Sequence, residues 1–210
     1  KGMAWWEEGK SGDKWTVPYL PVDPKDLGRE YESDVIRINS QSGKGGVAFI
    51  LKQNFGIALP QDMREEVGYL IKGISDEKHS ELTPADIFGI FESHYVTVRD
   101  RFDITECHFV QKPGDIEAAV TIKTADGTET VKASGNGRLD AVSNALKKAY
   151  EMKFTLVTYQ EHALEKSSSS KAIAYVGIQK PDGTLSWGAG VDPDIIRASI
   201  DALVTAINNR

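Results

Sequence analysis

Two glycines separated by an asparagine, Gly135-Asn136-Gly137, stand between an expected strand and a segment with helical periodicity. Glycines at such a junction let the backbone approach a ligand closely, and the amides at the start of a helix attract an anion. The same pattern is typical of a turn that requires positive φ. The motif therefore indicates either an anion-binding helix start or a structural turn, and the GxG spacing alone does not separate the two.

A second glycine-rich segment, SQSGKGG at 40–46, looks at first like a phosphate-binding loop. The GxxxxGK[ST] spacing is absent, because Lys44 is followed by Gly45. We therefore expect these glycines to make a tight lead into a helix, without a nucleotide site.

Residues that commonly hold metal ions are scattered along the chain. Cys107 is the single cysteine, which excludes an intrachain disulfide and a cysteine-based zinc site. Glu161-His162 could suggest acid–base chemistry, but neither a nucleophile nor a second carboxylate has a recognisable relation to the pair, so we expect a structural histidine. The four histidines have neither HxxxH nor HExxH spacing: they are His79, His94, His108 and His162. The sequence predicts no metal site.

The overall charge disfavours several classes of protein. The 210 residues include 25 Lys and Arg against 31 Asp and Glu, which gives a formal net charge of −6. Nucleic-acid-binding proteins usually carry a basic face, so we expect no nucleic acid partner. No stretch approaches the roughly 20 apolar residues that span a bilayer, so no membrane partner is expected. The single cysteine fits a cytoplasmic setting. A first residue other than Met suggests a fragment of a longer protein.

Residue composition and hydrophobic patterning divide the chain into three parts. Residues 1–30 are expected to form an extended linker arm, since prolines recur at every third residue of VPYLPVDP and exclude a helix. Three tryptophans and Tyr19 make the arm unusually aromatic, so it needs a partner surface on a missing domain or another subunit. Residues 31–97 are expected to form a mainly helical accessory subdomain, and residues 98–210 form the third part.

The accessory subdomain begins with an expected short strand at 35–38. The run VAFILK at 47–52 fits a strand or a helix by pattern, and we favour a helix that closes near Gly56. A second helix follows Pro60. Thr83-Pro84 should open a third, with Thr83 as the N-cap. The second helix gathers its apolar residues on one face: Met63, Val67, Leu70, Ile71 and Ile74.

Residues 98–210 contain an internal repeat. DGT occurs at 126–128 and at 182–184, and such Asx-Gly turns are typical of hairpins. The sequence thus predicts an α+β protein, in which a small, mainly helical linker subdomain precedes a duplicated βββα domain. The two copies should pack on each other or on a second chain. The expected strands are 102–110, 116–124 and 128–134, then 154–162, 171–180 and 184–191; the expected helices are 138–151 and one opened by Asp192-Pro193, with Asp192 as its N-cap.

Four segments of this chain resemble one enzyme family. WTVPYLPVDPKDLGREYESDVIRINSQSGKGG at 15–46 is similar to the long-form 2-isopropylmalate synthases of bacteria and fungi. GNGRLDA (135–141), YQEHAL (159–164) and WGAGVDPDIIRASIDALVTAIN (187–208) resemble the regulatory domain of that family, in the same order. Citramalate and homocitrate synthases are related, but the PYLPxDP arm favours isopropylmalate synthase. A free-standing small-molecule-binding or dimerisation module is the alternative, and a barrel encoded upstream would exclude it.

The resemblance implies a catalytic role outside most of this chain. The family condenses acetyl-CoA with 3-methyl-2-oxobutanoate, the first committed step of leucine biosynthesis, in a barrel that holds a divalent metal (Mg, Mn or Zn). The matching barrel would precede Lys1, so this chain should hold no cofactor and be inactive alone. Its expected partners are its own catalytic barrel and a second copy in a homodimer. Tyr19 matches the tyrosine of the PYLP motif, a catalytic residue that reaches the partner subunit's active site.

The resemblance also implies feedback inhibition by L-leucine, bound between two βββα units near the dimer interface. Two positions depart from the family pattern: Arg138 stands where proline is frequent, and Asp140 where a small residue is common. Both should make the lip of the pocket more polar. The implied leucine contacts are Gly135, Asn136, Gly137, Leu139, Leu156, Tyr159, Ala163, Ala172 and Ile195.

Overall fold

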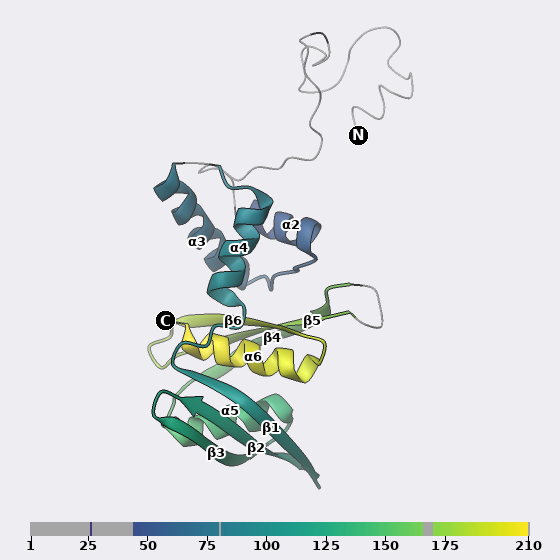
Figure 1. Cartoon of the computed structure of the whole chain (residues 1–210), viewed down its shortest axis with the longest axis vertical. Coiled ribbons are helices and arrows are strands. Elements are labelled where there is room, and N and C mark those ends of the chain that lie inside the picture. Colours follow the sequence, from purple (N-terminus) through teal and green to yellow (C-terminus); the bar gives the residue numbers. More distant parts are fainter. Residues whose placement is uncertain (1–25, 27–43, 80, 166–169, 210) are drawn as a thin grey trace. The chain divides into compact units, whose positions relative to one another are not determined.

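The computed structural model describes residue 26 and residues 44–79, 81–165 and 170–209. The chain divides into two units, 1–36 and 37–210. Helices α2–α6 and strands β1–β6 all belong to the second unit (Figure 1). Apart from Asp26, the expected arm with Tyr19 lies outside the described residues, as does the expected strand at 35–38.

Three helices form the accessory part of the second unit: α2 (Lys44–Phe55), α3 (Met63–Lys78) and α4 (Pro84–Tyr95). The helix predicted at 47–52 is confirmed. It ends where Gly56 takes a positive φ of 70° and donates its N–H to the Lys52 carbonyl oxygen. Thr83 caps α4 as expected, because it exchanges hydrogen bonds with Asp86 in a capping box.

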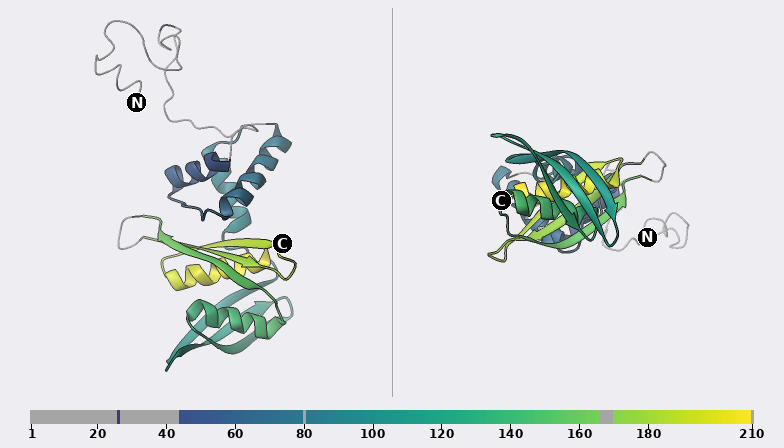
Figure 2. Two further views of the ribbon diagram at one scale, coloured as in Figure 1. Left: turned by 180° about the vertical axis from the view of Figure 1, so that it is seen from behind. Right: turned by 90° about the horizontal axis from the view of Figure 1, so that it is seen from below.

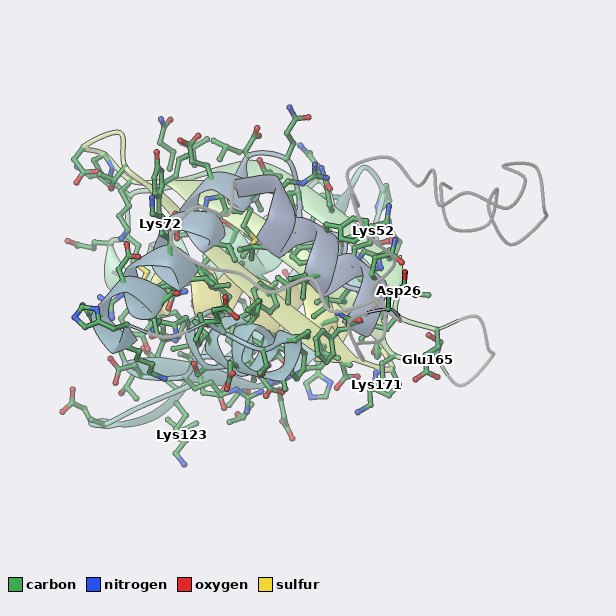
Figure 3. The ribbon with its side chains drawn as sticks, turned by 90° about the horizontal axis from the view of Figure 1, so that it is seen from above. Asp26, Lys52, Lys72, Lys123, Glu165 and Lys171 are labelled. Atoms are coloured by element: carbon green, nitrogen blue, oxygen red, sulfur yellow. The ribbon has the colours of Figure 1, made fainter. Side chains whose placement is uncertain are left out.

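The accessory helices bury one apolar face and expose a charged one. Charged side chains such as Lys52 and Lys72 lie at the surface (Figure 3). No helix among the described residues has the length and apolar content to cross a membrane. The buried side chains of the three helices include Val47, Ile50, Leu51, Met63, Val67, Ile71, Ile87 and Phe91.

The duplicated βββα domain is present as predicted, so the α+β fold class is confirmed. Each copy forms a three-stranded antiparallel sheet in sequence order. Both DGT segments lie at hairpin turns, where Gly127 and Gly183 have φ values of 144° and 86°. The first copy comprises β1 (Phe102–Lys112), β2 (Asp115–Thr124), β3 (Gly127–Gly135) and α5 (Arg138–Tyr150). The second comprises β4 (Thr155–Ala163), β5 (Ala172–Gln179), β6 (Leu185–Asp192) and α6 (Ile195–Asn208).

The start of α6 corrects the prediction by two residues. The sequence predicts Asp192 as the N-cap, but the cap is Asp194, whose carboxylate accepts a hydrogen bond from the Ile196 N–H at 2.8 Å. Asp192 still belongs to β6, where it pairs with Ala172. Its carboxylate accepts from the Asp194 N–H at 2.8 Å. An aspartate on each side of a proline offers two possible caps, and the length of the strand decides between them.

The second sheet is covered on both faces. Helix α6 packs on one face and lies between the two sheets, while the accessory helices pack on the other (Figures 1 and 2). This explains why β5 reads as a continuous apolar run, since alternate residues enter different cores. Ala174 and Val176 join the core with α5 and α6, whereas Ile173 and Tyr175 join the core with the accessory helices.

Helix α6 lies against β6 with almost no side chain between the two backbones. A Cβ atom added at Gly188 would stand 2.2 Å from the Ala202 carbonyl oxygen, and one at Gly190 would stand 2.1 Å from that of Ala198. Every residue of α6 from Ala198 onwards is buried. Glycine at these two positions is therefore required by space, because any side chain would force the helix away from the sheet.

We expect Gly190→Ala to destabilise the protein by about 1–3 kcal/mol or more, since the new methyl group overlaps the backbone of α6. The matched control is Gly73→Ala, whose Cβ would meet nothing within 4 Å in the middle of α3. The control should raise stability by about 0.5–1 kcal/mol, because alanine is the better helix former. Urea midpoints that shift in the same direction for both variants would contradict this account of the packing.

Candidate ligand-binding site

A cavity of about 800 Å³ opens where the two βββα copies meet. The first turns of α5 and α6 form two of its walls, and the start of β4 forms a third. Most of the lining is apolar, with charged groups at the α5 side. The lining residues are Ile116, Gly137, Arg138, Leu139, Asp140, Ser143, Lys147, Thr155, Leu156, Tyr159, Ile196, Ser199 and Ile200.

The structure brings together part of the set expected from the sequence. Gly137, Leu139, Leu156 and Tyr159 line the cavity. Gly135, Asn136 and Ile195 are not lining residues but their neighbours in the chain: Gly135 and Asn136 directly precede Gly137, and Ile195 directly precedes Ile196. Ala163 and Ala172 do not line it: they are cross-strand partners at the end of β4 and the start of β5.

Several lining residues were missed by sequence reasoning, although simple counting would have found most of them. Ser143 and Lys147 follow Leu139 at four-residue steps on α5, which places the three on one face of the helix. Ile196, Ser199 and Ile200 share a face of α6 for the same reason. Ile116 is paired with Gly135 across β2 and β3, and counting back from the DGT turn gives that register.

The GNG motif is not a positive-φ turn. Gly137 has an extended backbone with φ −155° and ψ 175°. The described glycines with positive φ are Gly56, Gly114, Gly127 and Gly183, so Gly135 is not among them. The structural-turn interpretation, which required positive φ, is therefore wrong for this motif.

The two glycines of the motif instead leave space, each in a different way. A Cβ atom at Gly135 would lie 2.4 Å from the Ala141 backbone nitrogen and 2.6 Å from Asp140 Oδ2, so this glycine lets β3 end directly against α5. A Cβ atom at Gly137 would meet nothing within 4 Å. Gly137 is thus free of packing demands from the chain, and it leaves this part of the cavity wall open.

The start of α5 is suited to an anion. Its N-cap is Gly137, which has no side chain to accept hydrogen bonds from the first-turn N–H groups. These groups and the positive end of the helix dipole favour negative charge. The guanidinium of Arg138, 5.6 Å from the centre of the Phe109 ring, adds positive charge beside them.

Asp140 places a negative charge at the same lip. One of its carboxylate oxygens accepts a hydrogen bond from the Asn136 N–H at 2.9 Å. The cavity therefore presents positive charge from Arg138 and Lys147 together with a carboxylate, next to an apolar wall. This arrangement is complementary to a small molecule that carries an ammonium group, a carboxylate and an apolar side chain.

Tyr159 joins the β4 wall of the cavity to α6. Its hydroxyl donates to the Glu161 carboxylate and lies 2.8 Å from Ser199 Oγ, which in turn donates to the Ile195 carbonyl oxygen at 2.7 Å. Desolvation raises the pKa of the Tyr159 phenol, and the hydrogen bond to Glu161 raises it further. The phenol therefore stays neutral and serves as a polar anchor in an otherwise apolar wall.

His162 is a structural histidine, as expected. Its Nε2 accepts a hydrogen bond from the Ala58 N–H at 3.2 Å and lies 3.2 Å from the Tyr175 hydroxyl. These contacts tie β4 and β5 to the accessory part. Within the described residues, no group of three or more His, Cys, Asp or Glu side chains is arranged to hold a metal ion.

Two protein-family models match this chain, one in its N-terminal part and one in its C-terminal part. Residues 81–210 match the family model of the LeuA allosteric (dimerisation) domain. The chain belongs to this LeuA family. Residues 1–52 match a second model, the alpha-isopropylmalate synthase post-catalytic domain-like family. The chain thus corresponds to the C-terminal region of 2-isopropylmalate synthases, which confirms the family resemblance seen in the sequence.

Curated relatives of the LeuA family cover nearly the whole chain. The 2-isopropylmalate synthase of Desulfitobacterium hafniense is 45% identical over 208 residues, which are 99% of this chain and 37% of that protein. The synthase of Helicobacter hepaticus is 44% identical over 216 residues, 99% of this chain and 38% of that protein. The synthase of Clostridium acetobutylicum is also 44% identical, with the same coverage. The chain therefore spans well under half the length of these relatives.

We expect alanine at the two glycines of the GNG motif to have unequal effects on stability. Gly135→Ala should cost about 1–3 kcal/mol, because its methyl group overlaps the start of α5. Gly137→Ala should leave stability within about 0.5 kcal/mol of the wild type, because its backbone is extended and its surroundings are open. Thermal melts would separate the two, and equal losses would show that Gly137 is also packed.

Proposed function

We propose that this chain is the leucine-sensing, dimer-forming region of a 2-isopropylmalate synthase. The complete enzyme would condense acetyl-CoA with 3-methyl-2-oxobutanoate, and leucine would inhibit it. The observation that carries the proposal is the cavity between the two βββα copies, which combines an uncapped helix start, opposite charges and an apolar wall.

The charges of the cavity suggest how an amino acid would sit. Its carboxylate would accept hydrogen bonds from the first-turn N–H groups of α5 and pair with Arg138. Its ammonium group would face the carboxylate of Asp140. The isobutyl side chain would then lie among Leu139, Leu156 and the first turn of α6, where Ile195 and Ile196 stand.

The apolar wall would provide selectivity among amino acids. Burying an isobutyl group contributes roughly 1.5–3 kcal/mol, and a single methylene contributes about 0.8 kcal/mol. Valine, one methylene shorter, should therefore bind about fourfold less tightly if leucine fills the wall. Isoleucine has the same number of carbons but branches closer to the backbone, so it tests the shape of the wall rather than its area.

Other parts of the proposed function depend on regions beyond the described residues. Tyr19 is proposed to donate a hydrogen bond in the active site of the partner subunit, and a divalent metal to act in the catalytic barrel. The cytoplasm is the proposed location, as for a biosynthetic enzyme. Tyr19→Phe in the complete enzyme would test the first of these points through the turnover rate.

Calorimetric titration of the chain should show that leucine binds more tightly than valine. Gly137→Val should abolish this binding, because a branched side chain would occupy the space beside the first-turn amides of α5. The variant should stay folded, since an extended backbone accepts valine. Gly73→Ala on α3 is the control and should bind leucine as the wild type does. Wild-type affinity in a folded Gly137→Val would show that the site is misplaced, and tighter binding of isoleucine would favour a related synthase.

The chain should form dimers in solution. Val157 and Tyr159 on β4, which are 46% and 41% exposed, leave apolar surface beside the cavity that a second copy would cover. Multi-angle light scattering at tens of micromolar should give twice the mass of the chain. A clean monomer at that concentration would count against dimerisation by this region.

A further inference from the structure

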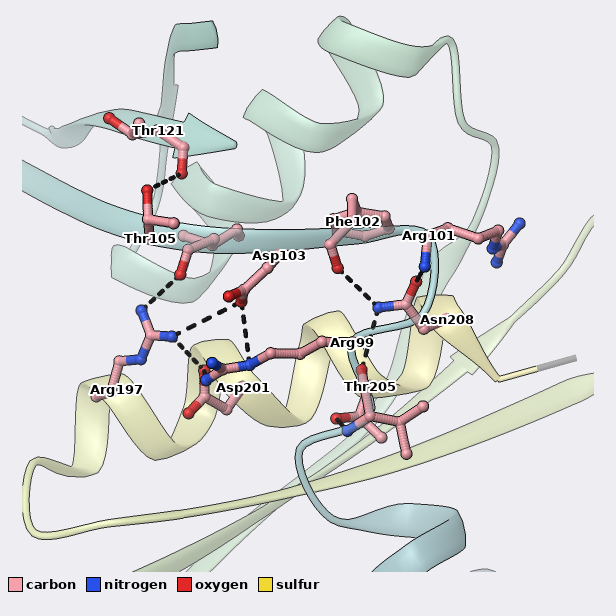
Figure 4. Close-up of polar contacts among 12 residues, drawn as sticks. Arg99, Arg101, Phe102, Asp103, Thr105, Thr121, Arg197, Asp201, Thr205 and Asn208 are labelled. Atoms are coloured by element: carbon pink, nitrogen blue, oxygen red, sulfur yellow. Dashed lines mark hydrogen bonds and ion pairs between the residues drawn. The ribbon is translucent and has the colours of Figure 1, made fainter. Parts of the chain in front are cut away.

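The connector between α4 and β1, residues 96–101, is fastened to α6 by hydrogen bonds (Figure 4). The Val98 N–H donates to Thr205 Oγ1 at 3.0 Å, and the Arg101 N–H donates to Asn208 Oδ1 at 3.1 Å. The amide nitrogen of Asn208 donates to the carbonyl oxygens of Val98 and Phe102 at 3.1 and 3.0 Å. Two side chains of α6 therefore hold the backbone of this short segment from Val98 to Arg101.

Ion pairs fasten the same connector to the middle of α6 (Figure 4). Arg99 pairs with Asp103 at 3.1 Å and with Asp201 at 3.3 Å. Arg197 pairs with Asp201 at 2.8 Å and donates to the Ile104 carbonyl oxygen at 2.7 Å. Asp201 is only 5% exposed, so separating it from these guanidinium groups would leave a buried charge without a partner. The connector is therefore expected to follow α6 when the helix moves.

The other end of α6 is a wall of the cavity. Ile196, Ser199 and Ile200 all line it, and Ser199 also contacts Tyr159 on β4. One helix thus touches the candidate ligand site with its first turns and holds the connector with its later ones. A shift of the helix at the cavity would displace the helix along its whole length, because packed protein interiors are nearly incompressible.

Helix α6 and strand β6 should move as one body, because no β6 side chain separates their backbones at Gly188 and Gly190, and Ser186 Oγ donates to the Ala206 carbonyl oxygen at 2.7 Å. The opposite face of β6 carries Trp187 and Ala189, which belong to the core shared with the accessory helices. Thr97 in the connector donates its N–H to the Ala189 carbonyl oxygen of β6 at 3.1 Å. The α6–β6 pair therefore reaches the accessory helices by two routes: the connector and the face of β6.

We propose that Thr205 and Asn208 are positioning residues that couple the cavity to the accessory helices through the connector. A ligand against the first turns of α6 shifts α6 and β6 together, and the two side chains carry the shift to residues 96–101 and to α4. This coupling rests on the proposed leucine site and states how its occupancy leaves the regulatory domain. It requires that the ligand binds the shifted arrangement better than the unshifted one.

The test compares leucine binding with the response of the connector in the full chain. Calorimetry gives the leucine Kd, and amide hydrogen exchange of Val96 and Arg101, with and without saturating leucine, gives the response. In the wild type, leucine should change both exchange rates by about fivefold or more, the lower end of typical coupling between sites. Thr205→Val removes the hydroxyl that holds Val98 and keeps the shape of the side chain. It should leave the leucine Kd unchanged and bring the ratio of exchange rates with and without leucine closer to one than in the wild type, since Asn208 and Arg99 still hold the connector.

Two further variants make the result specific. Thr121→Val is the matched control, because its hydroxyl pairs with Thr130 on the first sheet rather than with α6 or the connector. It should keep both the Kd and the exchange ratio. Arg99→Gln, at a side chain that is 37% exposed, removes one ion pair of Asp201 and leaves Arg197 as its partner, and it should also reduce the ratio.

Each outcome separates the coupling from the proposed function. A wild-type chain that gives no heat with leucine would overturn the leucine site, and the coupling with it. Leucine binding without any change at Val96 and Arg101 would overturn the coupling alone. A folded Thr205→Val that shifts the basal exchange rates but keeps the wild-type ratio would reduce Thr205 to a structural residue, which also overturns the coupling.

Discussion

The contact between α6 and β6 at Gly188 and Gly190 is the constraint on which the other parts of the described fold depend. Because two glycines let the backbones touch, α6 lies close enough to the second sheet to be buried along most of its length. It can then pack against the second sheet and the first βββα copy and also bind the connector. The second sheet, covered by α6 on one face, remains free to receive the accessory helices on the other.

The duplication produces two equivalent helix starts that differ in charge. Gly137 and Asp194 are both N-caps, and each stands two residues after the last residue of the preceding strand. Asp194 supplies its own carboxylate to the first turn of α6, so that start already holds an anion. Gly137 supplies none, and the corresponding place on α5 is open towards the cavity. The repeated fold thus gives one helix start with a side-chain cap and one without.

The cavity itself exists because the two copies do not close fully upon each other. Its apolar wall comes from side chains that would otherwise complete the core between α5, β4 and α6, such as Leu139, Leu156 and Ile196. A ligand with an apolar side chain would complete that core, which links ligand binding to the packing of the domain. The ion pairs and hydrogen bonds of α6 then give this packing a defined route to the accessory helices.

Local patterns in the sequence determined the elements of this protein, because strands, caps and hairpin turns are set by residues close together in the chain. The repeat, the α+β class, the cap at Thr83 and the family all follow from such patterns. Asp192 shows the limit, since Asp-Pro-Asp offers two caps and only the pairing of β6 chooses Asp194. The tertiary structure alone decided what the GNG motif does: its glycines leave space for α5 and for the cavity, and neither takes positive φ. Space between elements depends on contacts across long separations in the chain, such as those of α6 with the connector about 100 residues earlier, and no local pattern records them.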